Sequence, residues 1–176
     1  MRIIRGKYKG RHFPTPTNFK ARPTTDFAKE GLFNILENVY VDFDEEPTAL
    51  DLFAGTGSIG LELASRGCKK VVSVEKDFKH WQFLSRVSKM LGDNAWLPLK
   101  NDAFKFCASC KEHYDIIFAD PPYALEHLDK IPDAALPLLS EDGLFILEHG
   151  KDYDFSQHPR FVDHRTYGSV NFSFFK

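Results

Sequence analysis

The chain has 176 residues, 43% of them hydrophobic, which is enough for one full core and too little for two comfortable domains. It contains neither a signal-peptide pattern nor the roughly 18 consecutive apolar residues of a membrane span, and three cysteines do not make a disulfide framework. We therefore expect one α/β domain, residues 1–176, in a soluble cytoplasmic protein without a membrane partner.

The net charge of −2 conceals a strongly basic N-terminal segment. Residues 1–25 contain seven Lys and Arg and no acid, a charge of +7, so the rest of the chain carries −9. Residues 2–4 and 11–13 flank a glycine-containing turn, which predicts a small hairpin with exposed basic side chains. We interpret residues 1–22 as an arm that contacts nucleic acid, with a merely solubilising hairpin as the alternative. The candidate contact residues are Arg2, Arg5, Lys7, Lys9, Arg11, Arg22 and Thr24.

The next element is an amphipathic helix. Thr24 or Thr25 is placed to cap its N-terminus. Four apolar residues recur at the spacing of one helix face and are expected to face the core: Leu32, Ile35, Leu36 and Val39.

Residues 50–60, LDLFAGTGSIG, carry an apolar run into a glycine-rich turn. The run suits a buried parallel strand, and Gly55, Gly57 and Gly60 let the backbone turn sharply and approach a ligand. A helix is expected from about Ser58, with its free N–H groups facing that ligand.

The spacing Gly55-x-Gly57-x-x-Gly60 also fits the dinucleotide fingerprint, and Glu75 lies where a ribose-binding acid would be expected. Asp51 makes a dinucleotide less suitable, because a carboxylate at the strand end repels a pyrophosphate and attracts a sulfonium or an ammonium. S-adenosylmethionine is thereby favoured over NAD. An NAD-dependent oxidoreductase and an unliganded tight turn remain the alternatives.

A second strand over residues 71–75 and a helix over 77–91 follow, and then a third strand over 96–100. The helix is expected to bury Phe78, Trp81, Leu84, Val87 and Leu91. Pro98 places the third strand at a sheet edge, as in a doubly wound sheet that begins in the order 3-2-1.

Cys107 and Cys110, with His113 nearby, are spaced like two metal ligands. A tetrahedral site needs further ligands, and none lies at a suitable spacing, so we expect no metal and interpret the cysteines as small helix residues.

The last part of the chain predicts two more central strands, over 115–120 and 143–148, with a helix between them over 132–139. A terminal hairpin follows, with strands over 161–167 and 170–175 that turn at Gly168. Alternating strands and helices that end in a hairpin imply a mostly parallel sheet with one reversed strand.

Four carboxylates, those of Asp51, Glu75, Asp102 and Asp120, lie at predicted strand ends and would face one crevice. Each alone is compatible with an ordinary acid at a strand end. In a site for S-adenosylmethionine, Glu75 would accept the ribose hydroxyls and Asp102 the adenine amino group. Asp51 would neutralise the ammonium, directly or through water.

Residues 120–123, Asp-Pro-Pro-Tyr, form the second site motif. Two prolines remove two N–H donors and leave a rigid run of carbonyls, although an ordinary turn is compatible with the same residues. An exocyclic amine held by the Asp120 carboxylate and the Pro121 carbonyl would turn its lone pair toward the methyl donor. Tyr123 would stack on a base that has left its helix or loop.

Together LDLFAGTGSIGLELASRG, VVSVE, the Asn-Asp pair at 101–102 and FADPPY resemble class I S-adenosylmethionine-dependent methyltransferases that act on an exocyclic amine. RIIRGKYKGRHFPTP, RPTTD and LFNIL are similar, in the same order, to the RsmD-type small-subunit ribosomal RNA guanine-N2 methyltransferases. The resemblance implies an α/β, Rossmann-like fold with a mostly parallel seven-stranded sheet, one antiparallel strand, helices on both faces and an N-terminal β-hairpin extension.

The resemblance also implies a monomeric enzyme that methylates the N2 amine of a guanine in 16S rRNA within a partly assembled small subunit. An adenine-N6 methyltransferase of DNA or RNA, and an RNA-binding assembly factor without turnover, are the alternatives. The implied catalytic residues are Asp120, Pro121, Pro122 and Tyr123. The implied cofactor contacts are Asp51, Phe53, Gly55, Gly57, Glu75, Lys76, Asp102 and Ala103.

One departure from the family pattern concerns RNA binding. Phe27, Ala28 and Lys29 stand where two arginines around an apolar residue are expected. If those arginines hold RNA in relatives, this chain must depend more on Arg22, Lys29 and the hairpin.

Overall fold

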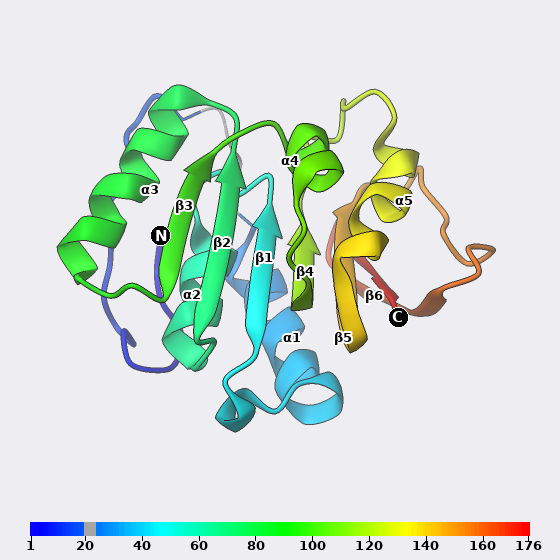
Figure 1. Ribbon diagram of the computed structural model, residues 1–176, viewed down its shortest axis with the longest axis horizontal. Helices are drawn as coiled ribbons and strands as arrows, with labels where there is room; N and C mark the ends of the chain where they lie inside the picture. Colours follow the sequence, from blue (N-terminus) through cyan, green and yellow to red (C-terminus); the bar gives the residue numbers. More distant parts are fainter. Residues whose placement is uncertain (20–23) are drawn as a thin grey trace.

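The computed structural model describes residues 1–19 and 24–176. A seven-stranded sheet with the order β3-β2-β1-β4-β5-β7-β6 runs through it (Figure 1). The first five strands in this order are parallel, and β7 runs antiparallel to both of its neighbours. The predicted Rossmann-like class I fold, with one reversed strand, is confirmed.

Strands and helices alternate along most of the chain, as parallel pairing with crossover connections requires. The strands are β1 (Thr48–Leu52), β2 (Lys70–Glu75), β3 (Trp96–Lys100), β4 (Tyr114–Ala119), β5 (Leu139–His149), β6 (Phe161–Tyr167) and β7 (Val170–Phe175). The helices are α1 (Asp26–Ile35), α2 (Ser58–Arg66), α3 (Phe78–Leu91), α4 (Ala103–Ser109) and α5 (Ile131–Ala135). The Pro98 strand lies at the sheet edge, as predicted.

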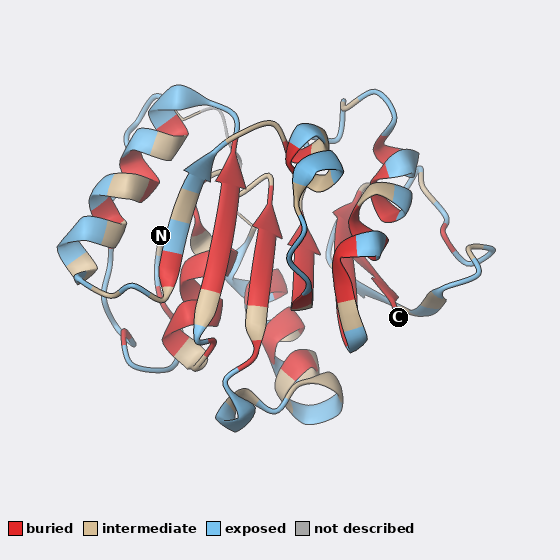
Figure 2. Ribbon diagram, viewed as in Figure 1, coloured by how far each residue is buried: buried red, intermediate tan, exposed pale blue. Residues whose placement is uncertain are grey.

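The core has two halves, one on each face of the sheet. Side chains of α1, α2 and α3 pack on one face, and those of α4 and α5 on the other. The central strands are therefore buried almost throughout, as the red strands of Figure 2 show. Polar groups that must reach a ligand can then only gather where these strands end.

Two predicted helix faces are partly wrong. Leu32 and Leu36 are buried, but Val39 is 64% exposed, because α1 continues as a π-helix over Leu36–Tyr40 and the 3.6-residue repeat is lost there. In α3 the residue Phe78 is 55% exposed and Phe83 is buried instead. Residues spaced by three drift steadily around a helix at about 100° per residue, so the predicted stripe leaves the buried face.

The N-terminal segment is bound closely to the domain and does not project from it. An isolated antiparallel bridge between Arg2 and His12 joins its two halves. Backbone hydrogen bonds between Ile3 and Arg11 and between Met1 and Phe13 lie on either side of it, so the segment folds back on itself without forming regular strands. Ile3, Tyr8 and Phe13 are buried in the core. The backbone N–H of Lys7 donates to the Ser65 carbonyl of α2 at 2.8 Å.

A buried carboxylate, that of Glu62 on α2, holds this segment and α1 together. Its oxygens accept the backbone N–H groups of Ile4 and Arg5 at 2.8 and 3.0 Å. The same carboxylate pairs with Lys29 at 3.2 Å and with Arg66 at 2.8 Å. Since the Lys29 side chain is 1% exposed, the expectation that it contacts RNA is wrong.

Candidate active site

A cavity of about 500 Å³ lies at the carboxyl ends of β1, β4 and β5. It brings together the glycine-rich turn, the Asp-Pro-Pro-Tyr loop and the residues just before α1. Its lining includes Thr24, Thr25, Asp51, Phe53, Gly55, Thr56, Asp120, Pro121, Pro122, Tyr123, Glu148 and Ser169. None of the described lining residues is basic.

The strand register places two carboxylates side by side at the floor of this cavity. Ala119 of β4 pairs with Leu147 of β5, so Asp120 and Glu148 occupy the next position on each strand. Asp51 of β1 pairs with Phe118, two residues before Asp120, and therefore points to the same face of the sheet. Burial and the negative charges of Glu148 and Asp51 raise the pKa of Asp120 well above its usual range.

Glu148 is a site residue that the sequence interpretation missed. Its side chain accepts a hydrogen bond from Thr24 Oγ1 at 3.1 Å and one from the Tyr123 hydroxyl at 3.4 Å. The residue is 4% exposed, and burial raises its pKa to about 7 despite these two hydrogen bonds. The available signal was its place at the end of the apolar run GLFILE, which matches that of Asp120 at the end of DIIFAD.

Asp51 faces the cavity and also fixes the glycine-rich turn. Its Oδ2 accepts the Gly60 backbone N–H and the Ser73 hydroxyl, each at 3.1 Å. A Cβ on Gly60 would lie 2.1 Å from Ser73 Oγ, so only glycine allows this contact. Desolvation raises the pKa of Asp51 to about 7.

The turn itself depends on two glycines in the left-handed region. Gly55 has φ 54° and Gly57 has φ 75°, and Gly57 is the N-cap of α2. A Cβ on Gly57 would lie 2.5 Å from a methyl group of Leu84. The backbone N–H of Gly55 donates to Glu75 at 2.7 Å, which joins the turn to the end of β2.

The remaining predicted cofactor residues lie outside this cavity lining, at the ends of β2 and β3. Glu75 also accepts the Asp77 backbone N–H at 2.7 Å, so both of its oxygens hold backbone groups. Asp102 caps α4, whose first residue is Ala103, and pairs with Lys76 at 3.1 Å. The structure thus divides the predicted cofactor set into two adjoining groups, and their cofactor roles stay predictions.

Of the five described cations among the predicted nucleic-acid contacts, three already have acidic partners. Arg2 lies 3.6 Å from Glu30, Arg5 lies 2.6 Å from Glu37, and Lys7 pairs with Asp93. Among the described residues no acid lies within ion-pair distance of Lys9 or Arg11, and both are exposed. Arg22 lies outside the described residues, and Thr24 lies in the cavity against Glu148.

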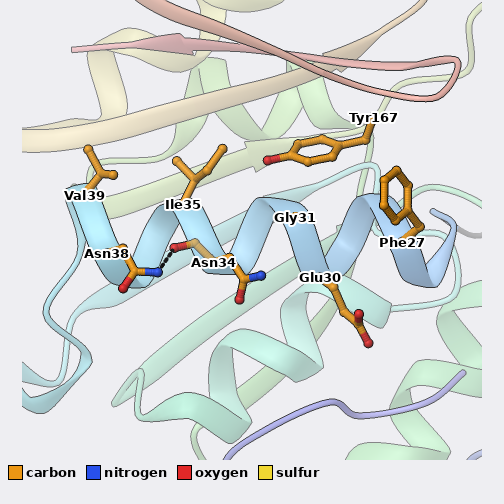
Figure 3. A pocket seen from close by; sticks show the side chains of 8 residues that line it. All are labelled: Phe27, Glu30, Gly31, Asn34, Ile35, Asn38, Val39 and Tyr167. Atoms are coloured by element: carbon orange, nitrogen blue, oxygen red, sulfur yellow. Dashed lines mark hydrogen bonds between the residues drawn. The ribbon is translucent and has the colours of Figure 1, made fainter.

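Phe27, at a position where arginine was expected, forms an aromatic pair. Phe27 is 67% exposed, and its ring meets that of Tyr167 edge-on at 5.9 Å (Figure 3). The Tyr167 ring lies against α1 over Gly31, where a Cβ would come within 2.2 Å of it. Both rings line a separate pocket of about 430 Å³ along α1, and neither lines the cavity described above (Figure 3).

The described residues offer neither a metal-binding cluster nor a membrane-spanning helix. No group of three His, Cys, Asp or Glu side chains suited to a metal ion occurs in the part of the chain that the structure describes. Cys107 lies on α4, where burial raises the pKa of its thiol to about 11. Among the helices described, none is long and apolar enough to cross a bilayer.

The whole chain, residues 1–176, matches the family model described as "Conserved hypothetical protein 95". The chain belongs to this family. A relative in Bacillus subtilis, "Putative rRNA methyltransferase YlbH", is 34% identical over 160 residues, which are 88% of this chain and 85% of that protein. "Ribosomal RNA small subunit methyltransferase D" of Escherichia coli K12 is 34% identical over 144 residues, 81% of this chain and 68% of that one.

Solved structures also resemble this one. The "Putative methyltransferase yhhF from Escherichia coli" superposes with a TM-score of 0.84 at 28% identity, over 99% of this chain and 96% of that one. The resemblance to the RsmD-type methyltransferases, drawn from the motifs, is confirmed by these relatives.

Proposed function

We propose that the protein is an S-adenosylmethionine-dependent methyltransferase that acts on the exocyclic N2 amine of a guanine in 16S rRNA. The observation that carries this proposal is the cavity in which Asp120 and its proline loop, Glu148 and Asp51 meet beside a glycine-rich turn. The names of the relatives, rRNA methyltransferase and ribosomal RNA small subunit methyltransferase D, support the substrate class.

The residues present fit a positively charged methyl donor better than a dinucleotide. The described lining contains carboxylates and no basic side chain, which would repel a pyrophosphate. A cationic ligand would stabilise the ionised form of Asp51, whose pKa is raised to about 7, mainly by desolvation. The residues that would hold the cofactor are Asp51, Phe53, Gly55, Gly57, Glu75, Lys76, Asp102 and Ala103.

When bound, S-adenosylmethionine supplies a methyl group on a positively charged sulfur. The chain itself orients the amine and stabilises it as it becomes cationic. Asp120 would accept one N–H of the amine, and the Pro121 carbonyl the other, in a loop that has no N–H donor at either proline. The Asp120 carboxylate would then stabilise the developing charge and take the proton that the methylated amine releases.

The target base would enter the cavity past Tyr123, whereas the turn of the N-terminal segment lies at the C-terminal end of α2, where the Lys7 backbone N–H donates to the Ser65 carbonyl. Tyr123 is 48% exposed at the cavity and would stack on the base that enters it. Lys9 and Arg11, exposed and without an acidic partner among the described residues, are the cations of the N-terminal segment that remain available to phosphates. The proposed substrate is 16S rRNA in a partly assembled small subunit, and the proposed enzyme is a monomer.

The test is loss of one modified nucleotide in a strain that lacks the protein. Mass spectrometry of its digested 16S rRNA should show one N2-methylguanine missing. Returning the wild-type gene to the strain should restore that methylation. Loss of a methyladenine with methylguanine intact would contradict the substrate. In parallel, S-adenosylmethionine should raise the Tm of the purified protein and NAD should not.

A further inference from the structure

Two carboxylates share the cavity, but only one of them has a role in the proposed reaction. Asp120 belongs to the Asp-Pro-Pro-Tyr loop and is accounted for by the proposed chemistry. Glu148 lies beside it, one strand away, which is about 4.8 Å in a sheet. Both line the same cavity of about 500 Å³, yet the methyl transfer proposed above assigns Glu148 no part.

Glu148 is held in place and still has acceptor capacity. Thr24 donates to its Oε2 and Tyr123 to its Oε1, so the carboxylate is fixed from two different segments of the chain. An ionised carboxylate offers about four acceptor positions, of which these hydroxyls use two. No Lys, Arg or His among the described residues pairs with it. Buried acids of this kind are satisfied by a partner, and the cavity leaves that partner to a ligand.

The edges of the bases differ in what they present to two neighbouring carboxylates. Guanine presents two adjacent donors, its N1–H and its N2 amine. Adenine presents an amine beside its N1 atom. This N1 is a hydrogen-bond acceptor, so its lone pair would repel a carboxylate oxygen. Sites built around a buried hydrogen bond reject analogues that cannot make it far more strongly than apolar pockets do.

We infer that Glu148 determines base specificity, by accepting the N1–H of guanine while Asp120 accepts the N2 amine. This inference rests on the proposed function and deepens it. Glu148 is then a specificity-determining residue, and Thr24 and Tyr123 are positioning residues that hold its carboxylate. The same pair of acids excludes adenine even though its exocyclic amine would suit the proline loop.

The experiment uses 2-aminopurine, which keeps the 2-amino group of guanine but has an acceptor at N1. Small subunits are reassembled with a ligated 16S rRNA that carries either guanine or 2-aminopurine at the mapped target. The measured quantity is kcat/KM for methyl transfer to each base. Wild-type protein should prefer guanine by about 100-fold or more, because the N1 acceptor meets the Glu148 carboxylate.

The variant Glu148→Gln should reduce this preference by at least about tenfold, since an amide can donate to the N1 of 2-aminopurine. Glu141→Gln is the matched control, because Glu141 lies on the same strand but is exposed. Tm and S-adenosylmethionine binding of each variant verify its fold. Should Glu148→Gln not fold, Glu148→Asp is the second variant. Its kcat/KM for guanine should fall, while guanine should still be preferred over 2-aminopurine.

Two results would overturn the inference: equal wild-type rates on the two bases, or a preference that Glu148→Gln leaves unchanged. An equal loss of rate on both bases belongs to the second result and would indicate a merely structural role. Failure of the proposed function is distinguishable, because wild-type protein would then transfer no methyl group to guanine in any of these subunits.

Discussion

The buried carboxylate of Glu62 allows a stability prediction with a worked magnitude. Glu62→Gln keeps the size of the side chain but removes the charge that pairs with Lys29 and Arg66, whose side chains are 1% and 4% exposed. Leaving a buried charge uncompensated costs about 3–5 kcal/mol of unfolding free energy. At roughly 2–4 °C per kcal/mol for a domain of this size, the Tm should fall by about 6–20 °C.

The assay is thermal unfolding followed by circular dichroism, together with limited proteolysis. Because Glu62 also binds the backbone of Ile4 and Arg5, the segment before residue 14 should be cleaved faster in the variant. Glu112→Gln, which removes an exposed pair with Lys70, is the control and should change stability by under about 1 kcal/mol.

Adding Lys29→Met to Glu62→Gln should recover part of the loss, since no unpaired ammonium then remains buried. A Tm for Glu62→Gln within 2 °C of wild type, by the same scale of roughly 2–4 °C per kcal/mol, would refute this reasoning. A further fall on adding Lys29→Met would refute it as well.

Three further predictions concern the site. Asp51 and Glu148 have pKa values raised to about 7, so the folded state binds more protons than the unfolded chain, and the stability of the ligand-free protein should fall as pH rises from about 4.5 to 7. A Tm that rises over this range would contradict the shifts. Gly57→Ala should abolish S-adenosylmethionine binding in calorimetry, whereas Gly10→Ala, also at positive φ but with nothing within 4 Å of a Cβ, should bind normally. Lys9→Ala should weaken RNA binding and lower the salt slope by about 1 without changing kcat, and an unchanged slope would exclude a phosphate contact.

Local sequence signals predicted the strands and the floor of the site well. The apolar runs that end at Asp51 and Asp120 mark central strands, because such strands are buried on both faces and only their ends reach a ligand. Pro98 identified an edge strand from its missing donor alone. These features depend only on residues that are neighbours in the chain, so the sequence alone predicts them.

The features that were missed depend on contacts between distant segments. Lys29 can be buried because its ammonium forms an ion pair with Glu62, which lies on another helix. No local sequence pattern shows that pairing. Glu148 enters the site only through the register of β5 on β4 and the hydroxyl of Thr24, 124 residues away. Val39 is exposed because a π-helix interrupts the repeat, which periodicity alone does not reveal.

The most direct test of the central claim is transfer of labelled methyl from S-adenosylmethionine to small subunits purified from cells that lack this protein. Wild-type protein should label one guanine at N2, and Asp120→Asn should slow the single-turnover rate by about 10²–10³-fold with its Tm and cofactor binding retained. Label on adenine, no label, or a full rate with Asp120→Asn would contradict the account.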